Sequence, residues 1–174
     1  MPQPIIIVDY NPQWPAMYEK EKARILGTIG HKVVAIEHIG STAVSGLGSK
    51  PIIDIMAAVR RMSDSLECIE PLQTLGYEYY YYPEFPERCV FLDGSVGAAP
   101  HHLHMTEFLS DFWTEKLLFR DYLRAHPEAA EKYCRLKKKW AKKYGADRDK
   151  YEDYTEAKTP FIEAVLARAR SEQP

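Results

Sequence analysis

The stretch that decides the fold is EHIGSTAVSGLGSKPIIDI, which runs from Glu37 to Ile55. It begins inside a segment rich in Val and Ile, residues 32–39, which predicts a strand that ends at Gly40. A loop of small residues follows, and residues 52–59 then predict a second strand. Because both faces of the second strand are apolar apart from Asp54, we expect it at the centre of a sheet that is covered on both sides.

The loop between these two strands has the composition of a phosphate-binding segment. Gly40 lets the backbone approach a phosphate closely, and Ser41 and Thr42 supply hydroxyl and amide donors. Lys50 adds a mobile cation beside them. We therefore expect a phosphorylated ligand at this turn.

Asp54 is the most informative residue of the chain. A carboxylate inside an apolar strand is costly unless it is paired with a cation, hydrogen-bonded or bound to a metal. A functional role is one interpretation. The structural alternative is that Asp54 accepts hydrogen bonds from backbone amides of the GSTAV turn.

A second informative segment is HHLHMTE, residues 101–107. Strand alternation puts His102 and His104 on one face and Leu103 and Met105 on the other. The apolar pair should face the core, so the two histidines should face a cleft. There they could ligate a metal or contact phosphate, or they could be ordinary structural histidines with satisfied hydrogen bonds. Arg88 would add charge to the same cleft if its strand is a neighbour.

The remaining pattern predicts a single α+β domain, residues 1–174, with a mixed sheet of about five strands. Residues 1–110 form its sheet core and residues 111–174 a helical block. The further predicted strands cover residues 5–8, 76–82 and 88–92. The predicted helices cover residues 13–28, 63–75, 111–125, 127–144 and 149–168, with Pro71 and Pro160 as sites of disturbance.

The composition narrows the function class. The 174 residues carry a net charge of -2 and are 45% hydrophobic and 28% charged, which is typical of a globular domain. No apolar run approaches the ~20 residues of a membrane helix, and no signal peptide is visible, so we expect a cytoplasmic protein without membrane contact. The three cysteines are widely spread and predict reduced, structural thiols.

Charge is distributed unevenly along the chain. Residues 1–111 hold 8 basic and 14 acidic side chains, whereas residues 112–174 hold 15 basic and 11 acidic ones. The basic excess concentrates at residues 132–150, which predicts either a solvated helix face or a surface for phosphate or RNA. The solvated face is the favoured interpretation, so a nucleic-acid partner is not expected.

Four motifs together resemble the GrpB family, a branch of the nucleotidyltransferase superfamily. They are EHIGSTAVSGLGSKPIID, HHLHM, FRDYLRAHPE and YTEAK, and the resemblance extends over residues 8–161. It implies a nucleotidyltransferase-like fold. A similar region is found fused behind dephospho-CoA kinase in some bacteria.

The superfamily pattern pairs a Gly-Ser turn with two acids on the next strand and a third acid on a neighbouring strand. Gly40 and Ser41 match the turn and Asp54 matches the first acid, whereas Met56 stands at the second acid position. Two-metal transfer needs carboxylates that bridge two divalent ions. The third position falls on the strand with His102 and His104, and a donor set of one Asp and two His suits a softer ion such as Zn²⁺, Mn²⁺ or Ni²⁺ better than Mg²⁺.

The resemblance implies an enzyme that transfers a nucleotidyl group from a nucleoside triphosphate to a small-molecule acceptor. Its catalytic residues would be Asp54, Ser41 and Lys50, with Gly40, Ser41, Thr42, Lys50 and Arg88 binding the nucleotide and Asp54, His102 and His104 holding a divalent metal (Mg, Mn or Zn). One alternative is a binding module for a nucleotide or phosphometabolite that has lost the chemistry. A second alternative is a metal-dependent hydrolase-like site on the same residues. The oligomeric state is left open.

Overall fold

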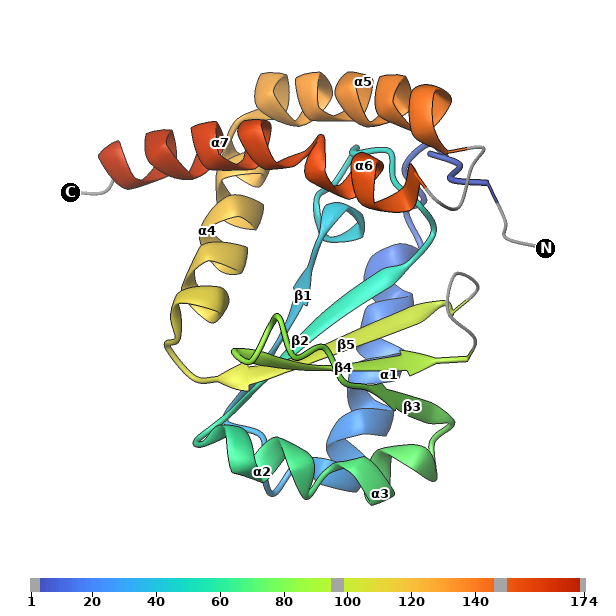
Figure 1. Ribbon diagram of the computed structural model, residues 1–174, viewed down its shortest axis with the longest axis vertical. Coiled ribbons are helices and arrows are strands. Elements are labelled where there is room, and N and C mark those ends of the chain that lie inside the picture. The colour runs from blue at the N-terminus through green and yellow to red at the C-terminus, as the bar shows by residue number, and fades with distance from the viewer. Residues whose placement is uncertain (1–3, 95–98, 146–149, 173–174) are drawn as a thin grey trace.

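The computed structural model of the protein describes residues 4–94, 99–145 and 150–172. Its five strands form one mixed sheet in the order β1-β2-β5-β4-β3 (Figure 1). Their bounds are β1 (Ala35–Ile39), β2 (Ile53–Val59), β3 (Tyr77–Tyr80), β4 (Arg88–Asp93) and β5 (His101–Glu107). The helices are α1 (Trp14–Ile29), α2 (Met62–Leu66), α3 (Ile69–Gln73), α4 (Asp111–Ala125), α5 (Pro127–Tyr144), α6 (Tyr151–Glu156) and α7 (Thr159–Ser171).

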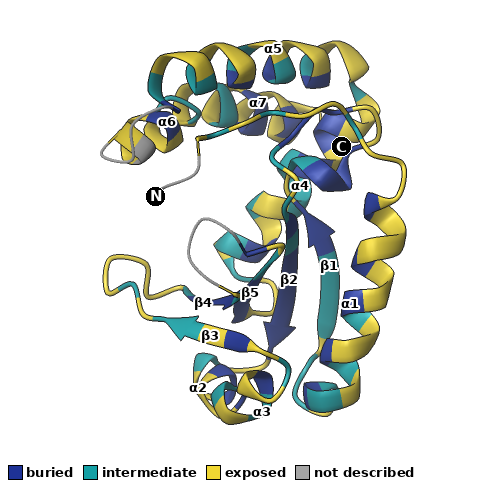
Figure 2. Cartoon of the chain, turned by 90° about the vertical axis from the view of Figure 1, so that its right-hand side faces the viewer, coloured by how far each residue is buried: buried dark blue, intermediate teal, exposed yellow. Residues whose placement is uncertain are grey.

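The strand β2 is central, as its apolar faces predict. It pairs antiparallel with β1 on one side and parallel with β5 on the other, so Asp54 lies opposite His102 and Met56 lies opposite His104. Residues 55–59 of the strand are fully buried, and Figure 2 shows it dark along most of its length. The parallel pairing with β5 brings together side chains that lie nearly fifty positions apart in the sequence.

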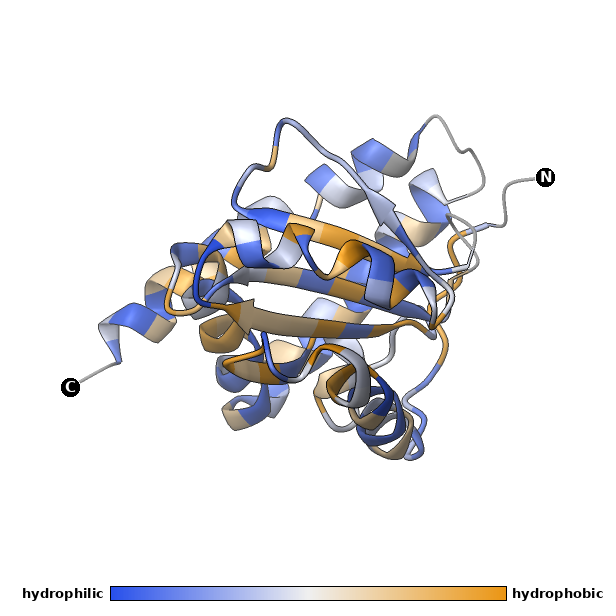
Figure 3. Cartoon of the chain, turned by 90° about the horizontal axis from the view of Figure 1, so that it is seen from below, coloured by the Kyte–Doolittle hydropathy of each residue, from blue (hydrophilic) through white to orange (hydrophobic). Residues whose placement is uncertain are grey.

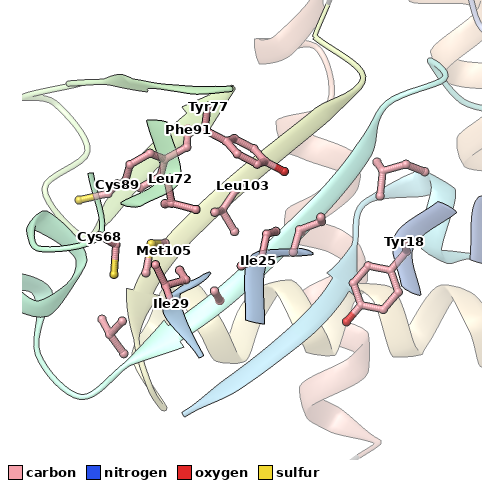
Figure 4. Packing of buried hydrophobic residues seen from close by; sticks show 14 of the residues in the cluster. Tyr18, Ile25, Ile29, Cys68, Leu72, Tyr77, Cys89, Phe91, Leu103 and Met105 are labelled. Carbon is pink, nitrogen blue, oxygen red and sulfur yellow. The ribbon is translucent and has the colours of Figure 1, made fainter. Parts of the chain in front are cut away.

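One face of the sheet packs against α1, α2 and α3. Ile55 of β2, Phe91 of β4 and Leu103 of β5 are fully buried there, against Ile25 and Ile29 of α1 (Figure 4). Figure 3 shows hydrophobic residues, in orange, along much of the strands. Burying five such side chains contributes on the order of 10 kcal/mol before conformational entropy is subtracted.

The other face of the sheet carries the candidate site and is covered by the carboxyl-terminal helices. Met56 and Ala58 of β2 pack with Ile39 of β1 and Trp113 of α4 in a small apolar cluster. A separate cluster joins α4, α5 and α7 to the loop after β1 through Val44 and similar side chains. The carboxyl-terminal block is thus fixed to the sheet at the end where β2 begins (Figures 1 and 2).

Several predicted elements differ from the structure. The predicted strand at residues 5–8 is not part of the sheet, because Val8 forms only an isolated antiparallel bridge with Ser49. The strand predicted to begin at residue 32 begins at Ala35. Ser41 opens a short 3-10 helix, η1 (Ser41–Ala43), rather than an irregular loop.

Two predicted helices are each divided in two. The segment 63–75 forms α2 and α3, because Pro71 has no N–H to donate to the carbonyl of residue 67 in a continuous helix. The segment 149–168 forms α6 and α7, with Pro160 in the first turn of α7, where a missing N–H costs nothing. Residue 149 lies outside the described residues.

No helix within the described ranges is both long and apolar enough to cross a lipid bilayer.

Candidate functional site

The site is built around the turn between β1 and β2, which packs directly on Asp54. Gly40 adopts φ 73°, a conformation that side chains disfavour. A Cβ atom at this position would lie 2.6 Å from Oδ2 of Asp54. The position therefore requires glycine for two reasons, the positive φ and the closeness of the carboxylate.

Asp54 is not the cap of the turn that the structural alternative predicts. The hydrogen bonds that side chains of the described turn form are those of Thr42 and of Ser41 with Lys137, not with Asp54, and the Asp54 side chain is 31% exposed. Oδ1 of Asp54 instead lies 3.6 Å from Nδ1 of His102 and 3.8 Å from Nε2 of His104. The three side chains therefore face a shared, solvent-reachable space.

The protonation states in this space follow from burial and charge. Burial alone would raise the pKa of Asp54, but His104, His102 and Lys50 outweigh it, so the pKa lies below its ordinary value. Burial lowers the pKa of His102, although Asp54 opposes the shift. At neutral pH the site therefore holds a carboxylate beside a neutral His102 imidazole.

The outer nitrogens of the two histidines have no partner. Nε2 of His102 and Nδ1 of His104 are buried and accept or donate no hydrogen bond among the described residues. A buried N–H without a partner costs more than a buried lone pair. The favoured tautomers therefore carry the proton on the inner nitrogens, so that both imidazoles donate toward Asp54 and the shared space.

The tautomers of His102 and His104 affect whether these residues can bind a metal. A histidine that ligates a metal offers the lone pair of its inner nitrogen and passes its other N–H to a partner. Within the described ranges, neither His102 nor His104 has such a partner. The ligand atoms of Glu21, Asp93 and His101 do converge within 4.8 Å of one another in the described residues, but that trio lies on the other face of the sheet.

The Glu21 trio is a structural network. Glu21 is 3% exposed and accepts hydrogen bonds from Arg24 on both oxygens, at 2.9 and 2.7 Å, and from the Tyr77 hydroxyl at 2.9 Å. His101 lies 2.8 Å from Oδ2 of Asp93. His101 therefore does not share the Asp54 face, since strand alternation turns it to the opposite side of β5.

Lysines from the carboxyl-terminal helices surround the Asp54 face. Lys137 of α5 is 3% exposed, and its amine donates to Oγ of Ser41 at 2.7 Å and to the carbonyl of Gly48 at 2.6 Å. Burial lowers its pKa to about 7, and repulsion from Lys158 and Lys50 adds to the effect. An amine held at Ser41 was not predicted for this site.

Two more lysines meet at a buried aromatic ring. The amines of Lys50 and Lys158 lie 5.8 and 4.8 Å from the ring centroid of Tyr154, which is 1% exposed. Burial, followed by repulsion from Lys50, lowers the pKa of Lys158 to about 8. Tyr154 thus holds two cations near one carboxylate, through contacts worth on the order of 1 kcal/mol each.

Arg88 and Lys116 extend the cationic face along the sheet. The guanidinium of Arg88 lies 4.3 Å from the ring centroid of Phe85 and 4.9 Å from that of Phe112, and its Nε is buried without a partner. Lys116 lies 5.2 Å from the Phe112 centroid and remains solvent-exposed. Desolvation by the surrounding protein, followed by repulsion from Arg88, lowers its pKa.

The predicted contribution of Thr42 is restricted by the structure. Its hydroxyl donates to the carbonyl of Ile52 at 3.1 Å and lies 2.9 Å from Nε2 of His38, and the residue is 1% exposed. Both contacts of that hydroxyl are within the protein, and they stabilise the turn. A contact of Thr42 with a ligand would have to come from its backbone amide.

Met56 is fully buried in its apolar cluster with Trp113, so no acid stands at the second position of the superfamily pattern. The residue opposite Met56 on the neighbouring strand β1 is Glu37, and the Glu37 carboxylate pairs with Arg120 at 2.6 Å. The face around Asp54 thus combines one carboxylate with several cations. This charge balance suits an anionic ligand better than a pair of divalent ions.

Two surface cavities lie away from this face. One of about 500 Å³ is lined by residues of the loops at the far end of β2, among them His31, Arg60 and Asp64. The other, of about 280 Å³, lies between α1, β1 and α4 and is lined by Tyr18 and Arg124 among others. In the second cavity, the Arg124 guanidinium is held by the protein itself, because it donates to the carbonyl of Ala43 at 2.9 Å.

The sequence indicates part of this site. It correctly brings Ser41, Asp54, His102 and His104 to one region, because turn chemistry and strand alternation determine their positions. It misses Lys116, Lys137 and Lys158. The sequence contains a sign of the role of Lys137, because its helical spacing from Ala130 and Tyr133 places it on the buried face of α5.

Comparisons with known proteins place this architecture. A sequence profile described as GrpB protein matches residues 4–168. The chain is 34% identical over 166 residues to the Glutamate-rich protein GrpB of Alkalihalophilus pseudofirmus, which covers 93% of this chain and 94% of that protein.

Two solved structures are similar to the fold. The crystal structure of GrpB from Enterococcus faecalis matches with a TM-score of 0.84 and 30% identity, over 94% of this chain and 96% of that one. The Cid1 poly (U) polymerase matches with a TM-score of 0.54 and 15% identity, over 78% of this chain and 44% of that one. The second likeness shows a shared fold alone, and it confirms the predicted nucleotidyltransferase-like architecture. The extent of the profile match and of the relatives shows that the chain belongs to the GrpB family.

Proposed function

We propose that this protein binds a nucleoside triphosphate, or a metabolite with a similar phosphate chain, on the sheet face that carries Asp54. The observation that supports this most is the placement of three lysines near Asp54: Lys137 donates to Ser41, and the amines of Lys50 and Lys158 lie over the ring of Tyr154. Cations held close together repel one another, and this repulsion adds to burial in lowering the pKa of Lys137 and of Lys158. A polyanion between them would relieve that repulsion.

The turn at Ser41 provides the second half of the argument. Ser41 is half-buried and Gly40 is exposed, with the Asp54 carboxylate packed against one side of Gly40. A phosphate at this turn would be reached by the Ser41 hydroxyl and by the amine of Lys137, which already lies 2.7 Å from it. Contacts of ammonium groups with phosphate are charge-assisted and stronger than neutral hydrogen bonds.

Titration calorimetry with each of the four ribonucleoside triphosphates tests this proposal. We expect saturable binding of at least one of them, weakened about tenfold or more by Lys50→Met because a cation near the phosphates is lost. Lys139→Met, which removes an exposed lysine of α5, is the matched control and should bind like the wild type. Failure of the wild type to bind any triphosphate or tripolyphosphate would refute the proposal.

Nucleotidyl transfer to a small acceptor is the second candidate, and the position of Asp54 favours it. Its carboxylate borders the Gly40–Ser41 turn, so it could accept a proton from an acceptor hydroxyl that attacks the bound nucleotide. The lowered pKa keeps Asp54 ionised for that role. Among metabolite acceptors, those with a free hydroxyl are the ones to screen.

The test of transfer is release of pyrophosphate from a bound triphosphate in the presence of candidate acceptors. Asp54→Ala should abolish turnover while changing the melting temperature little, because the side chain is partly exposed and lacks structural hydrogen bonds to the turn. Turnover that survives in Asp54→Ala would reject the catalytic role. Binding without turnover in the wild type would leave the binding function alone.

A further inference from the structure

We infer that the Asp54 face binds the phosphate chain of its ligand through lysine amines and histidine N–H groups, without requiring a divalent cation. The inference rests on the proposed function and specifies how the same site neutralises its ligand. It differs from the metal predicted at Asp54, His102 and His104 from the sequence. Three observations support it independently.

The first observation is the supply of carboxylates. Among the residues that the structure describes, Asp54 is the one acid that pairs with His102 and His104. Met56 fills the second acid position with a fully buried side chain, and Glu37 is engaged by Arg120. Since bridging of two ions needs several carboxylate oxygens, the described residues do not suit two-metal chemistry.

The second observation is the direction of the histidine donors. Nδ1 of His102 and Nε2 of His104 point to the space beside Asp54, while their outer nitrogens are buried without partners. A metal would take the inner lone pairs and leave two N–H groups orphaned in the protein. A phosphate oxygen would instead accept from both inner N–H groups and leave only lone pairs unpaired.

The third observation is the number and origin of the lysines. Lys50 comes from the loop before β2, Lys116 from α4, Lys137 from α5 and Lys158 from the segment before α7. Lys137 donates to Ser41, while Lys50 and Lys158 share the ring of Tyr154, and Lys116 lies over Phe112, whose ring is 6.2 Å from that of His104. Four separate elements therefore bring positive charge to this face. In a metal-dependent site that charge would repel the incoming ion, whereas it attracts a free polyphosphate.

The test uses the full-length chain and inorganic tripolyphosphate, which carries the phosphate chain without base or sugar. Calorimetric titrations are run in EDTA and again with excess Mg²⁺ or Mn²⁺. We expect the affinity for tripolyphosphate in EDTA to be higher than the affinity with a divalent ion, or to agree with it within about threefold. Lys158→Met and Lys116→Met should each weaken binding in EDTA about tenfold, whereas Lys139→Met should not. A melting curve of each variant verifies that it is folded.

Asp54→Asn gives the sharpest distinction because the two mechanisms predict opposite signs. Without a metal, removal of the carboxylate removes repulsion, so tripolyphosphate should bind equally well or more tightly. With a metal held by Asp54, the same variant should lose most of its affinity. Binding that needs a divalent ion and disappears in Asp54→Asn would overturn the inference and leave the proposed function standing. No binding of tripolyphosphate or nucleotide under any condition would overturn both.

Discussion

Gly40 has no room for a Cβ atom beside Asp54, and this gives the first prediction. Gly40→Ala should lower the free energy of unfolding by about 2 to 4 kcal/mol, because the methyl group combines a disfavoured φ with a contact on Asp54. Gly46→Ala is the matched control, since Gly46 also has positive φ but nothing within 4 Å. It should cost only about 1 kcal/mol in urea denaturation. Equal losses in the two variants would mean that the turn relaxes away from Asp54.

Lys137 gives a second prediction, which concerns pH. Its pKa is about 7 in the folded chain and near 10.5 when exposed, so unfolding takes up a proton between these values. Uptake of a proton on unfolding makes the folded state more stable as pH rises. The stability of the wild type relative to Lys137→Met should therefore increase from about pH 7 to about pH 10.

Chemical denaturation of both proteins across this range measures the effect. The same comparison with Lys139→Met, which removes an exposed amine from the same helix, is the control. A difference between the wild type and Lys137→Met that stayed constant with pH would show that the buried amine keeps its proton in the folded chain.

At the scale of the element, β2 couples the site to the core through alternate residues. Met56→Asp would place an acid at the position where the superfamily has one, but inside the cluster with Ile39, Ala58 and Trp113. We expect a loss of about 3 to 5 kcal/mol, because the new carboxylate has no cation or donor beside it. Met56→Leu conserves volume and should cost less than about 1.5 kcal/mol. If Met56→Asp folds with near-normal stability, this cluster is looser than its burial indicates.

The elements also show where sequence patterns suffice. The apolar faces of residues 52–59 and the alternation in residues 101–107 correctly predict two adjacent strands, because burial on a sheet imposes a period of two. Residues 5–8 carry a similar apolar run yet form no strand of the sheet. The backbone N–H of Ile5 instead donates to the carbonyl of Gly145, and a local sequence pattern does not predict a partner so far along the chain.

The lysines of the site illustrate the same limit. Lys137 belongs to the basic region 132–150, for which a solvated helix face is the favoured interpretation, and most of the lysines of α5 are indeed exposed. Whether a lysine points to solvent or to Ser41 depends on how α5 docks on the loop after β1. That docking is determined by tertiary packing through Val44 and Leu47, which the periodicity of α5 alone does not contain.

At the scale of the whole molecule, Arg120 joins the carboxyl-terminal block to the sheet. It is 8% exposed and donates to Oε2 of Glu37 at 2.6 Å and to the carbonyl of His38 at 3.0 Å. Arg120→Met should lower stability by about 2 to 3 kcal/mol, less than for a fully buried pair because Glu37 retains contact with water. Arg124→Met, which removes one bond to the Ala43 carbonyl, should cost about 1 kcal/mol.

Hydrogen exchange of β1 amides measures whether the block has been uncoupled in the Arg120→Met variant. We expect faster exchange in β1 and unchanged exchange in β3, which lies at the other edge of the sheet. Uniform acceleration across the whole sheet would instead indicate global destabilisation without a specific role for this linkage.

The distribution of the lysines along the chain has a kinetic consequence. Lys50, Lys116, Lys137 and Lys158 are separated by long stretches of sequence, so the anion-binding surface requires contacts of high sequence separation that form late in folding. A ligand that contacts all of them stabilises the native state more than the folding transition state. It should therefore slow unfolding while leaving the refolding rate almost unchanged, and the native lifetime would report occupancy of the site.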